Sequence, residues 1–593
     1  MVNNPVKETW IEKLIDFSVR NKFLVILLVA CSLAAALWSV KNIPLDAIPD
    51  LSDTQVIVYS RWDRSPDIIE DQVTYPIVSS LLGTPGVKAI RGFSDFGFSY
   101  VYVIFKDGTD IYWARSRVLE YLSKITANLP EGVKTEIGPD ATGVGWVYQY
   151  ALVDKSHKHS PQELRSFQDW NLKYHLQSVP GVSEIASIGG SVKQYQITVD
   201  PQKLLYYKIP INKVVDAVRA GNEETGGRLL EFSGAEYMVR GHGYVKNVED
   251  LEKIVVSADG KGTPILLNAV AHVDLGGDIR RGLADLDGTG DMVGGTVIMR
   301  SGENALNVIN RVKDKLKEVQ SSLPEGVEIV TTYDRSQLIV KSIDHLKKQL
   351  LEEVLIVSAV ILVFLWHFPS AFIPIITIPI AVFLSFIPLL GMKLTSNIMS
   401  LAGIAISIGV LVDGAIVQME NVYKRMEEWE EGGRKEDYKE VCIKALKEVG
   451  PSVFFSLLVI AVSFLPIFTL IDQEGRLFKP LAFSKTFAMV LSAILVVTFN
   501  PALRMLFLRV KPYRSKMANA LLVGKYYPEE KHPISKILFA VYDPLCRLVL
   551  RYRKTTLGIA ILLILTTIPI YMKLGSEFMP PLWEGDILYM PTP

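Results

Sequence analysis

Apolar residues gather in seven long runs that are separated by polar stretches of very different length. The first run, 23–41, follows a polar start at 1–22, and a long polar region, 42–348, separates it from a cluster of five runs within 349–508. The last run covers 555–572. A helix needs about 20 mainly apolar residues to cross a bilayer. The pattern therefore predicts a polytopic α-helical membrane protein.

The five clustered spans are expected at 350–368, 370–391, 398–420, 452–471 and 482–508. A charged segment, 421–450, interrupts them, and 509–554 is rich in Lys and Arg. Basic loops stay in the cytoplasm, so 509–554 is expected there. Counting spans from 509–554 places 1–22 and 421–450 on the same side. The region 42–348 and the last residues, 573–593, then fall outside.

Residues 10–22, WIEKLIDFSVRNK, alternate in a helical pattern, which favours a short helix on the membrane surface. In the outer region, strand-like 55–60 and 99–105 alternate with helix-like 68–82 and 113–129. This order predicts an α/β region built from ferredoxin-like β-α-β repeats.

The string LPEGV occurs at 129–133 and again at 323–327, each time twelve residues after an Arg-Val pair. The matched spacing favours an internal duplication. Between the two copies, 225–295 is rich in glycine with short strand-like pieces and is interpreted as an inserted subdomain.

Composition excludes several function classes. Of the 593 residues, 49% are hydrophobic, and Lys+Arg and Asp+Glu both number 63, so net charge gives no reason to expect a nucleic-acid partner. Cys31, Cys442 and Cys546 fit neither a disulfide framework nor a CxxC metal site. No GxxxxGK[ST] loop predicts ATP binding, and no nucleophile–base set predicts an enzyme.

The stretch Ile398–Tyr423 carries the strongest chemical signal, because it is apolar and yet contains Asp413, with Glu420 seven residues later. Seven residues are almost two helical turns, so both acids lie near one face. An acid at membrane depth costs about 2.5–3.5 kcal/mol. We therefore predict a proton relay through Asp413 and Glu420. The alternatives are an Asp413 that only pairs with a basic residue of another helix, and a Glu420 that only marks the water boundary.

Small residues would let neighbouring helices approach this stretch closely. They are Gly403, Ala405, Ser407, Gly409, Gly414 and Ala415. The triplet His157-Lys158-His159 could suggest a metal site, but its position between VYQYALVD and a helix-like segment favours a solvated turn.

Several strings carry a family resemblance across nearly the whole chain. They are PLDAIPDLSDTQVIV at 44–58, EDQVTYPI at 70–77, RGFSDFGFSYVYVIFKDGTDIYWARSRVLEYL at 91–122, GPDATGVGWVYQYAL at 138–152, TTYDRSQLI at 331–339, QEGRLFKPLAFSKTFAM at 473–489 and FMPPLWEGDILYMP at 578–591. Together with the 398–421 helix, they resemble the heavy-metal efflux branch of the RND (resistance–nodulation–division) transporter superfamily, the CusA/CzcA family.

The resemblance implies a proton-driven secondary transporter and no enzyme or resident cofactor. It implies a homotrimer in the bacterial inner membrane, with membrane lipid around it and a large periplasmic porter and docking region. Its partners would be a periplasmic adaptor and an outer-membrane factor. Asp413 matches the acid that takes up the proton, and Glu420 matches an acid of the same helix motif.

The resemblance also bears on the metal. Members for divalent cations have an extra acid where this chain has Ser407, so Cu(I) or Ag(I) is the favoured cargo and Zn, Co, Cd or Ni the alternative. Met590 matches a methionine of the periplasmic metal cleft and lies near Glu584 and Asp586. Thioether sulfur suits Cu(I) and Ag(I).

Two further methionines, Met399 and Met489, match a proposed membrane relay, with core packing as the alternative for each. Leu411, Gln418 and Arg504 stand where the Cu/Ag pattern has Met.

The family has twelve spans in two halves, so the chain up to Pro593 is expected to be the N-terminal half, a truncated RND fold. An inactive truncated or split subunit is therefore an alternative function. A multidrug RND pump and a protein-export component of the SecD/SecF kind are two more, although both would lack the metal-branch strings.

Overall fold

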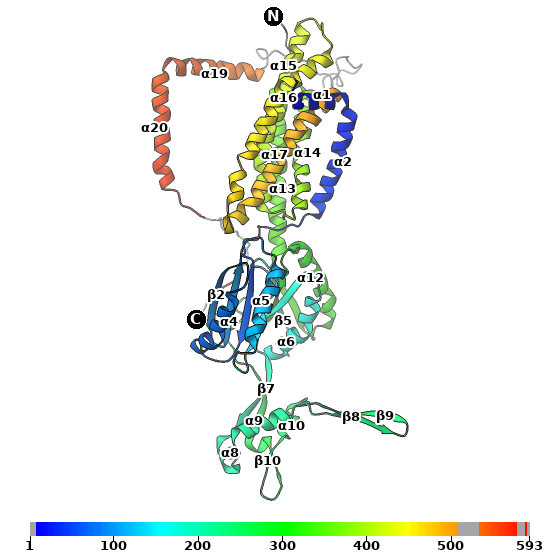
Figure 1. Ribbon diagram of the computed structural model, residues 1–593, viewed down its shortest axis with the longest axis vertical. Helices are drawn as coiled ribbons and strands as arrows, with labels where there is room; N and C mark the ends of the chain where they lie inside the picture. Colours follow the sequence, from blue (N-terminus) through cyan, green and yellow to red (C-terminus); the bar gives the residue numbers. More distant parts are fainter. Residues whose placement is uncertain (1–7, 281, 508–532, 578–586, 590–593) are drawn as a thin grey trace. The chain divides into compact units, whose positions relative to one another are not determined.

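The computed structural model describes residues 8–280, 282–507, 533–577 and 587–589 (Figure 1). The chain divides into two compact units. Unit 1 comprises Met1–Val144, Ser301–Asn307 and Arg335–Pro593, and unit 2 comprises Gly145–Arg300 and Val308–Asp334. Each unit has its own four-stranded sheet, and unit 1 also holds the long helices.

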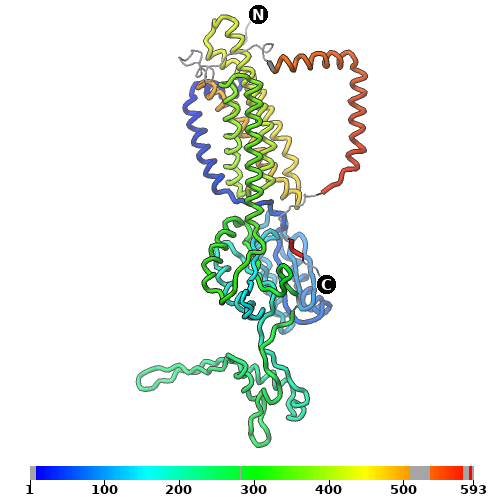
Figure 2. The backbone as a smooth tube through the Cα atoms, turned by 180° about the vertical axis from the view of Figure 1, so that it is seen from behind, coloured from blue at the N-terminus to red at the C-terminus, as the bar shows by residue number. Residues whose placement is uncertain are grey.

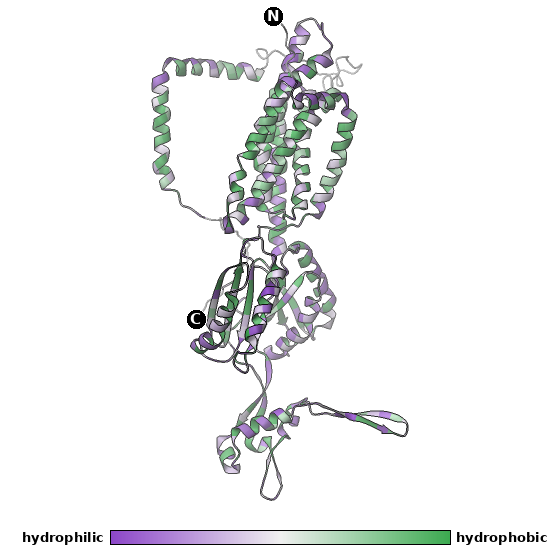
Figure 3. Ribbon diagram, in the orientation of Figure 1, coloured by the Kyte–Doolittle hydropathy of each residue, from purple (hydrophilic) through white to green (hydrophobic). Residues whose placement is uncertain are grey.

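The helices of unit 1 outside its sheet are α1 (Trp10–Arg20), α2 (Lys22–Asn42), α13 (Arg335–Leu365), α14 (Phe368–Gly391), α15 (Ile398–Glu431), α16 (Tyr438–Val462), η4 (Leu465–Thr469), α17 (Asp472–Phe507), α19 (Pro533–Arg551) and α20 (Arg553–Met572). Within the described residues, six helical stretches are long and apolar enough to cross a membrane. These are α2, α14, α15, α16 with η4, α17 and α20, and Figure 3 shows hydrophobic residues along them. The chain thus has the helices of a multi-pass membrane protein.

The expected span at 350–368 lies in the last part of α13 and is not among those six. Lys348, Glu352 and Glu353 interrupt its apolar pattern. The uncharged part, Val354–Leu365, has 12 residues, which explains why α13 is less apolar than the six helices, and the span at 350–368 stays a prediction. The helix instead begins at Arg335, directly after a strand, so a polar helical part continues into the apolar one.

Helix α15 packs in the middle of the bundle, against α13, α14, α16 and α17. A Cβ atom on Gly403 would overlap Ser484 Oγ and the carbonyl oxygen of Leu481 in α17. Further along, Val410 of α15 shares an apolar cluster with Ala493 and Val496 of α17. The two helices therefore run in the same direction in close contact, as the small residues of α15 predict.

The amphipathic helix α1 buries its apolar side against protein. Ile11 and Ile15 are fully buried, and α1 contacts α16 and α17. A Cβ atom on Gly450 of α16 would collide with Ile15 Cδ1. Trp10 and Phe17 remain exposed. The face expected to lie on a membrane surface is thus largely occupied by the bundle.

The sheet of unit 1 follows α2 along the chain. Its elements are β1 (Gln55–Arg61), α3 (Pro66–Ile69), η1 (Glu70–Thr74), α4 (Tyr75–Leu81), β2 (Val87–Asp95), β3 (Phe98–Phe105), α5 (Ile111–Thr126) and β4 (Lys134–Ile137). The strand order is β2-β3-β1-β4, and every adjacent pair is antiparallel. Alternate residues of β1, such as Val56 and Val58, are buried against the helices, which is the period-two pattern of a sheet with one covered face.

The sheet of unit 2 repeats this arrangement. Its elements are β5 (Trp146–Asp154), α6 (Pro161–Phe167), η2 (Gln168–Leu172), α7 (Lys173–Gln177), β6 (Val182–Gly189), β13 (Val293–Met299), α12 (Ala305–Val319), η3 (Gln320–Ser322) and β14 (Val327–Asp334). The order β14-β5-β13-β6 equals that of the first sheet when each strand is numbered within its own sheet. The first LPEGV string ends directly before β4, and the second ends at Val327, the first residue of the equivalent strand β14.

A smaller subdomain is inserted between β6 and β13. It consists of β7 (Lys193–Val199), α8 (Pro201–Tyr207), α9 (Ile211–Ala220), β8 (Thr225–Phe232), β9 (Ala235–Gly241), α10 (Val248–Glu252), β10 (Val255–Ala258), β11 (Pro264–Leu266), α11 (Leu267–Val270) and β12 (Ala271–Gly277). It begins earlier than the glycine-rich 225–295. The β8–β9 hairpin is exposed along both strands, and the backbone tube in Figure 2 shows it as a long, narrow hairpin.

Candidate functional site

The candidate proton-relay helix, α15, begins with a specific cap. Asn397 accepts a hydrogen bond from the backbone N–H of Ser400, and Ser400 Oγ accepts one from the backbone N–H of Asn397. Such a reciprocal cap satisfies N–H groups that the first turn leaves unpaired. The helix then continues without a break past Asp413 and Glu420 to Glu431.

Asp413 and Glu420 lie on one exposed face of α15, as their spacing predicts. The same face carries Ile406, Gly409 and Val417. No described residue forms an ion pair or hydrogen bond with either carboxylate, although acids nearer the end of α15 have partners. Glu428, for example, accepts a hydrogen bond of 2.9 Å from Arg425. The two acids therefore face away from α14, α16 and α17.

Ser407 lies on a different side of α15. It is fully buried, and its hydroxyl donates to the carbonyl oxygen of Ile404 at 2.6 Å. An acid at this position would enter a packed helix interface and not the face of Asp413.

The predicted methionine sites separate into three groups. Met489 of α17 is fully buried in the apolar core of the bundle, whereas Met399 is half-buried in the first turn of α15 and is not part of that core. The structure does not bring these two into one cluster. Met590, Glu584 and Asp586 lie outside the described residues.

The bundle interior is more polar than the sequence suggested. Gln418 is fully buried, and neither its amide nitrogen nor its amide oxygen has a partner among the described residues. Thr377 of α14 donates a 2.5 Å hydrogen bond to Asn500 Oδ1 of α17, and both residues are buried. Buried polar groups in a membrane bundle mark either helix contacts or a polar path.

Arg504 of α17 is another buried polar residue of the bundle. It is 1% exposed, and its Nη1 donates to Ser370 Oγ at 3.0 Å. Ser370 Oγ in turn lies 2.7 Å from His367 Nδ1. In the sequence, Leu411, Gln418 and Arg504 stand out only through the family resemblance, which implies methionine at these positions. Their burial, and the partners of Arg504, come from the helix packing.

A group of charged side chains lies where α17 meets the first sheet. Carboxylate oxygens of Asp53, Asp107 and Asp472 lie within 4.8 Å of one another. Arg476 binds Asp53 and Asp107, and Lys88 binds Asp472. The Arg476 guanidinium beside Asp107 holds the pKa of that carboxyl below its usual value. The string QEGRLF contains Arg476 and directly follows Asp472, but the sequence does not reveal that β2 and the loop after β3 meet these two residues.

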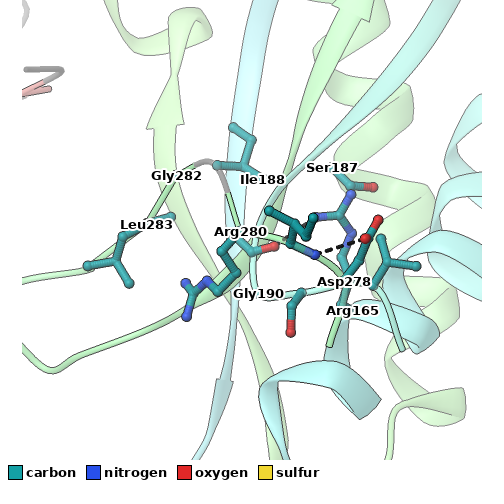
Figure 4. A pocket seen from close by; sticks show the side chains of 13 residues that line it. Arg165, Ser187, Ile188, Gly190, Asp278, Arg280, Gly282 and Leu283 are labelled. Carbon is teal, nitrogen blue, oxygen red and sulfur yellow. Dashed lines mark hydrogen bonds between the residues drawn. The ribbon is translucent and has the colours of Figure 1, made fainter. Parts of the chain in front are cut away.

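A cavity of about 350 Å³ lies in unit 2, and Figure 4 shows its wall. Its two arginines already have acidic partners. Arg165 Nε lies 2.8 Å from Asp169, and Arg280 Nη2 lies 2.8 Å from Asp291. The described lining also contains no Met, Cys or His side chain, so it lacks the ligands that a soft cation prefers.

The segment around His157 forms a turn between β5 and α6, as the sequence predicts. His157 has a positive φ of 52°. The backbone N–H of His159 donates to Asp154 Oδ2 at 2.8 Å, and a His159 ring nitrogen lies 3.2 Å from the carbonyl oxygen of Glu325.

Comparison with known proteins places this architecture in a family. The family model described as AcrB/AcrD/AcrF family matches residues 14–591. The chain is 50% identical over 588 residues to the cation efflux system protein CusA of Escherichia coli (strain K12), which covers 98% of this chain and 55% of that protein. It is 35% identical over 589 residues to the cobalt-zinc-cadmium resistance protein CzcA of Cupriavidus metallidurans, covering 97% of this chain and 54% of that protein.

A crystal structure of a heavy metal efflux pump, crystal form II, has a similar fold, with a TM-score of 0.80 and 28% identity. The match covers 96% of this chain and 53% of that one. The chain thus spans about half the length of the curated relatives that it matches. The match over nearly all of the chain shows that it belongs to the AcrB/AcrD/AcrF transporter family and, within it, to the heavy-metal efflux branch with the CusA and CzcA proteins.

Proposed function

We propose that the chain works in a proton-driven pump that exports heavy-metal cations, with Cu(I) and Ag(I) as the preferred cargo. The observation that carries the proposal is Asp413, an acid in the middle of an apolar helix and on a face that the described helices leave open. A carboxylate at that depth is costly unless it is protonated or paired with a cation. Uptake and release of a proton would therefore change what can lie against this face of α15.

Asp413 is the group that takes up the proton in this mechanism, and Glu420 lies on the same face toward the charged end of the helix. Neutralising a carboxylate releases any cationic partner that it holds. The bundle then has two arrangements of different stability, and the proton selects between them. Movement between the two would alternately open and close the outer part of the protein to a metal ion.

The choice of monovalent metal rests on donor chemistry. Met590, near Glu584 and Asp586, would supply a thioether ligand, and thioethers bind Cu(I) and Ag(I) better than Zn(II). The resemblance supports the same choice, because it implies an acid at position 407 in members for divalent cations, whereas this chain has the buried Ser407. Met399 and Met489 match a membrane relay by resemblance alone, and core packing is the favoured role, since Met489 is fully buried in the apolar core of the bundle.

The metal is cargo, and no resident cofactor belongs to the mechanism. The pump would be a homotrimer in the inner membrane, with lipid around it. The two sheets would form duplicated ferredoxin-like units in a periplasmic porter region, and the insertion after β6 would be the docking part. A periplasmic adaptor and an outer-membrane factor would complete the export path.

Metal tolerance tests the proposal directly. The chain would be expressed with its adjacent reading frames and adaptor in a cell that lacks its own metal efflux systems, and growth would be scored against Cu, Ag, Zn, Co, Cd and Ni salts. Protection against Cu or Ag alone is expected. Protection against Zn, Co, Cd or Ni would favour a divalent-cation pump. No protection despite membrane insertion would favour an inactive subunit.

A further inference from the structure

The linker between α2 and β1, residues 43–54, is bound to the outer ends of three helices. Its first part pairs with the residues that start α15. The N–H of Ser396 donates to the carbonyl oxygen of Pro44 at 2.8 Å, and the N–H of Asp46 donates back to Ser396 at 3.1 Å. The N–H of Ile398 donates to Ala47 at 3.1 Å. Ile43 and Ala47 are buried, so this part of the linker belongs to the end of the bundle.

Helix α13 holds the same part of the linker through a buried ion pair. Arg335, its first residue, is 6% exposed. Its Nη2 donates to Asp46 Oδ1 at 3.0 Å, and its Nη1 donates to the carbonyl oxygen of Val144 at 2.6 Å. Burial raises the pKa of Asp46 above its ordinary value, and Arg335 opposes this shift. A buried pair of this kind contributes little net stability but defines one geometry, because removing either partner leaves a buried charge.

Helix α17 holds the second part of the linker. The Arg476 guanidinium donates to the carbonyl oxygen of Leu51 at 2.9 Å and to Asp53 Oδ1 at 2.9 Å, and it also binds Asp107. Asp107 lies two residues after Phe105, the last residue of β3. Lys88 of β2 binds Asp472, the first residue of α17. One end of α17 is therefore joined to the linker and to two strands of the sheet.

The linker is also stiff and short. Pro44 and Pro49 each fix a φ angle, and the backbone N–H of Phe105 in β3 donates to the carbonyl oxygen of Thr54 at 2.8 Å. The linker can change its length only slightly, because its first part is hydrogen-bonded to the start of α15 and its other end continues as β1. Helices α15 and α17 are themselves in close contact at Gly403, so a shift of α15 would carry α17 with it.

We infer that the 43–54 linker is the element through which a shift of α15 and α17 moves the first outer sheet, and that Arg476 and Arg335 are the positioning residues that bind it to the helices. The inference rests on the proposed proton-driven transport, because it names the path by which a proton on Asp413 would act on the outer region. Neither arginine touches the proton or the metal. Each acts through the linker.

The ratio of metal exported to protons admitted tests this path, because a purely structural role would lower both fluxes together. The full pump would be reconstituted in vesicles, and both fluxes would be measured for Arg476→Gln. The expected result is a fall in the ratio of about tenfold, within the usual range of coupling between two sites. Arg425→Gln is the matched control, since Arg425 makes exposed ion pairs with Glu428 and Glu448 on the bundle alone.

Two further variants keep the test decisive. Charge exchange, Arg476→Asp with Asp107→Arg, is expected to recover part of the lost ratio. Adding two glycines after Leu51 lengthens the linker without removing any charge. If the Arg476→Gln protein does not reach the membrane, the flux ratio of this lengthened variant tests the inference instead. An unchanged ratio in both Arg476→Gln and the insertion would overturn the inference. Metal export without proton entry in the unaltered pump would instead contradict the proposed function.

Discussion

Asp413 and Ser407 lie six residues apart on α15, yet the first is exposed and the second is fully buried. Six residues correspond to about one and two-thirds helical turns, so the two side chains point to different sides. The helix therefore separates its titratable side from its packing side, and the following expectations depend on that separation.

Asp413→Asn is expected to abolish metal protection while the protein still inserts and assembles. Asn retains the size of the side chain but cannot change its charge. Protection would be measured as the metal concentration that halves growth, with membrane content checked by immunoblot. Glu430→Gln is the matched control, because Glu430 lies near the end of the same helix and pairs with Arg434 at the surface. Protection by Asp413→Asn at the level of the unaltered protein would contradict the relay.

Ser407→Asp is expected to destabilise the bundle by several kcal/mol, since it puts an unpaired charge between packed helices. It is not expected to shift the metal preference toward divalent cations. The thermal midpoint in detergent and the metal-tolerance panel would be measured together, with Ser407→Ala as the control. A stable Ser407→Asp variant that protects against Zn or Co would show that this position selects the metal.

Gly403→Ala is expected to cost about 1–3 kcal/mol of stability, because its Cβ would overlap Ser484 and the backbone of Leu481. Gly409→Ala is the matched control. A Cβ atom there meets no described atom within 4 Å, and alanine favours a helix by about 1 kcal/mol over glycine. Thermal midpoints of the two variants in one detergent would compare them. Equal losses at both positions would mean that the exposed face is as tightly covered in the assembled pump as the buried one.

Met590 and Met489 are expected to have different roles, metal binding for the first and core packing for the second. Met590→Ile should weaken Cu(I) or Ag(I) binding, because it removes a thioether and leaves an apolar side chain. Met489→Leu should cost less than about 1.5 kcal/mol, as volume-conserving core changes do, and leave transport unchanged. Titration of the purified protein with Ag(I) would measure the first, and flux assays the second. Unchanged Ag(I) affinity in Met590→Ile would assign Met590 to packing, and lost flux in a stable Met489→Leu would assign Met489 to the metal path.

Acid should weaken the contact between α17 and the first sheet. The pKa of Asp107 is lowered mainly by its hydrogen bond from Arg476. Its contribution to stability is therefore complete above the ordinary value of 3.8 and is lost as the pH falls through the lower folded-state value. The thermal midpoints of the unaltered protein and of Asp107→Asn should therefore approach each other as the pH falls below 3.8.

The contribution of Asp46 to stability should depend on pH in the opposite direction, because burial raises its pKa. Stability from this group should rise as the pH falls toward 3.8 from above. Thermal midpoints of Asp46→Asn over the same pH series would lack that rise. A loss of stability on acidification that both variants share equally with the unaltered protein would show that neither carboxyl contributes.

The sequence predicted those features that depend on local pattern. The helix that carries Asp413 begins at Ile398 as expected, and β3 covers the predicted strand 99–105 with one more residue, Phe98. These succeed because apolar runs and period-two alternation are written in neighbouring positions. The start of α13 at Arg335 was not predicted, because its polar part has no membrane-like composition.

The contacts that link distant segments could not be predicted. The hydrogen bond between Thr377 and Asn500 and the binding of Arg476 to Asp53 each join residues more than a hundred positions apart. Both depend on which helix ends and loops become neighbours. Composition does not show which segments become neighbours, and the same polar side chains could equally be exposed to solvent. The relay acids could be identified because an acid within an apolar helix is conspicuous without any knowledge of its neighbours.

The insertion after β6 leaves and re-enters its sheet at one place, where Gly189 pairs with Val293. In the first sheet, the equivalent strands β2 and β3 are joined by the short turn that contains Gly97. The same scaffold thus accepts either a tight turn or a whole subdomain at this corner. The insertion is consequently an exchangeable module. It could be replaced by a turn, or by the corresponding piece of another pump, while the sheet beneath it keeps its pairing.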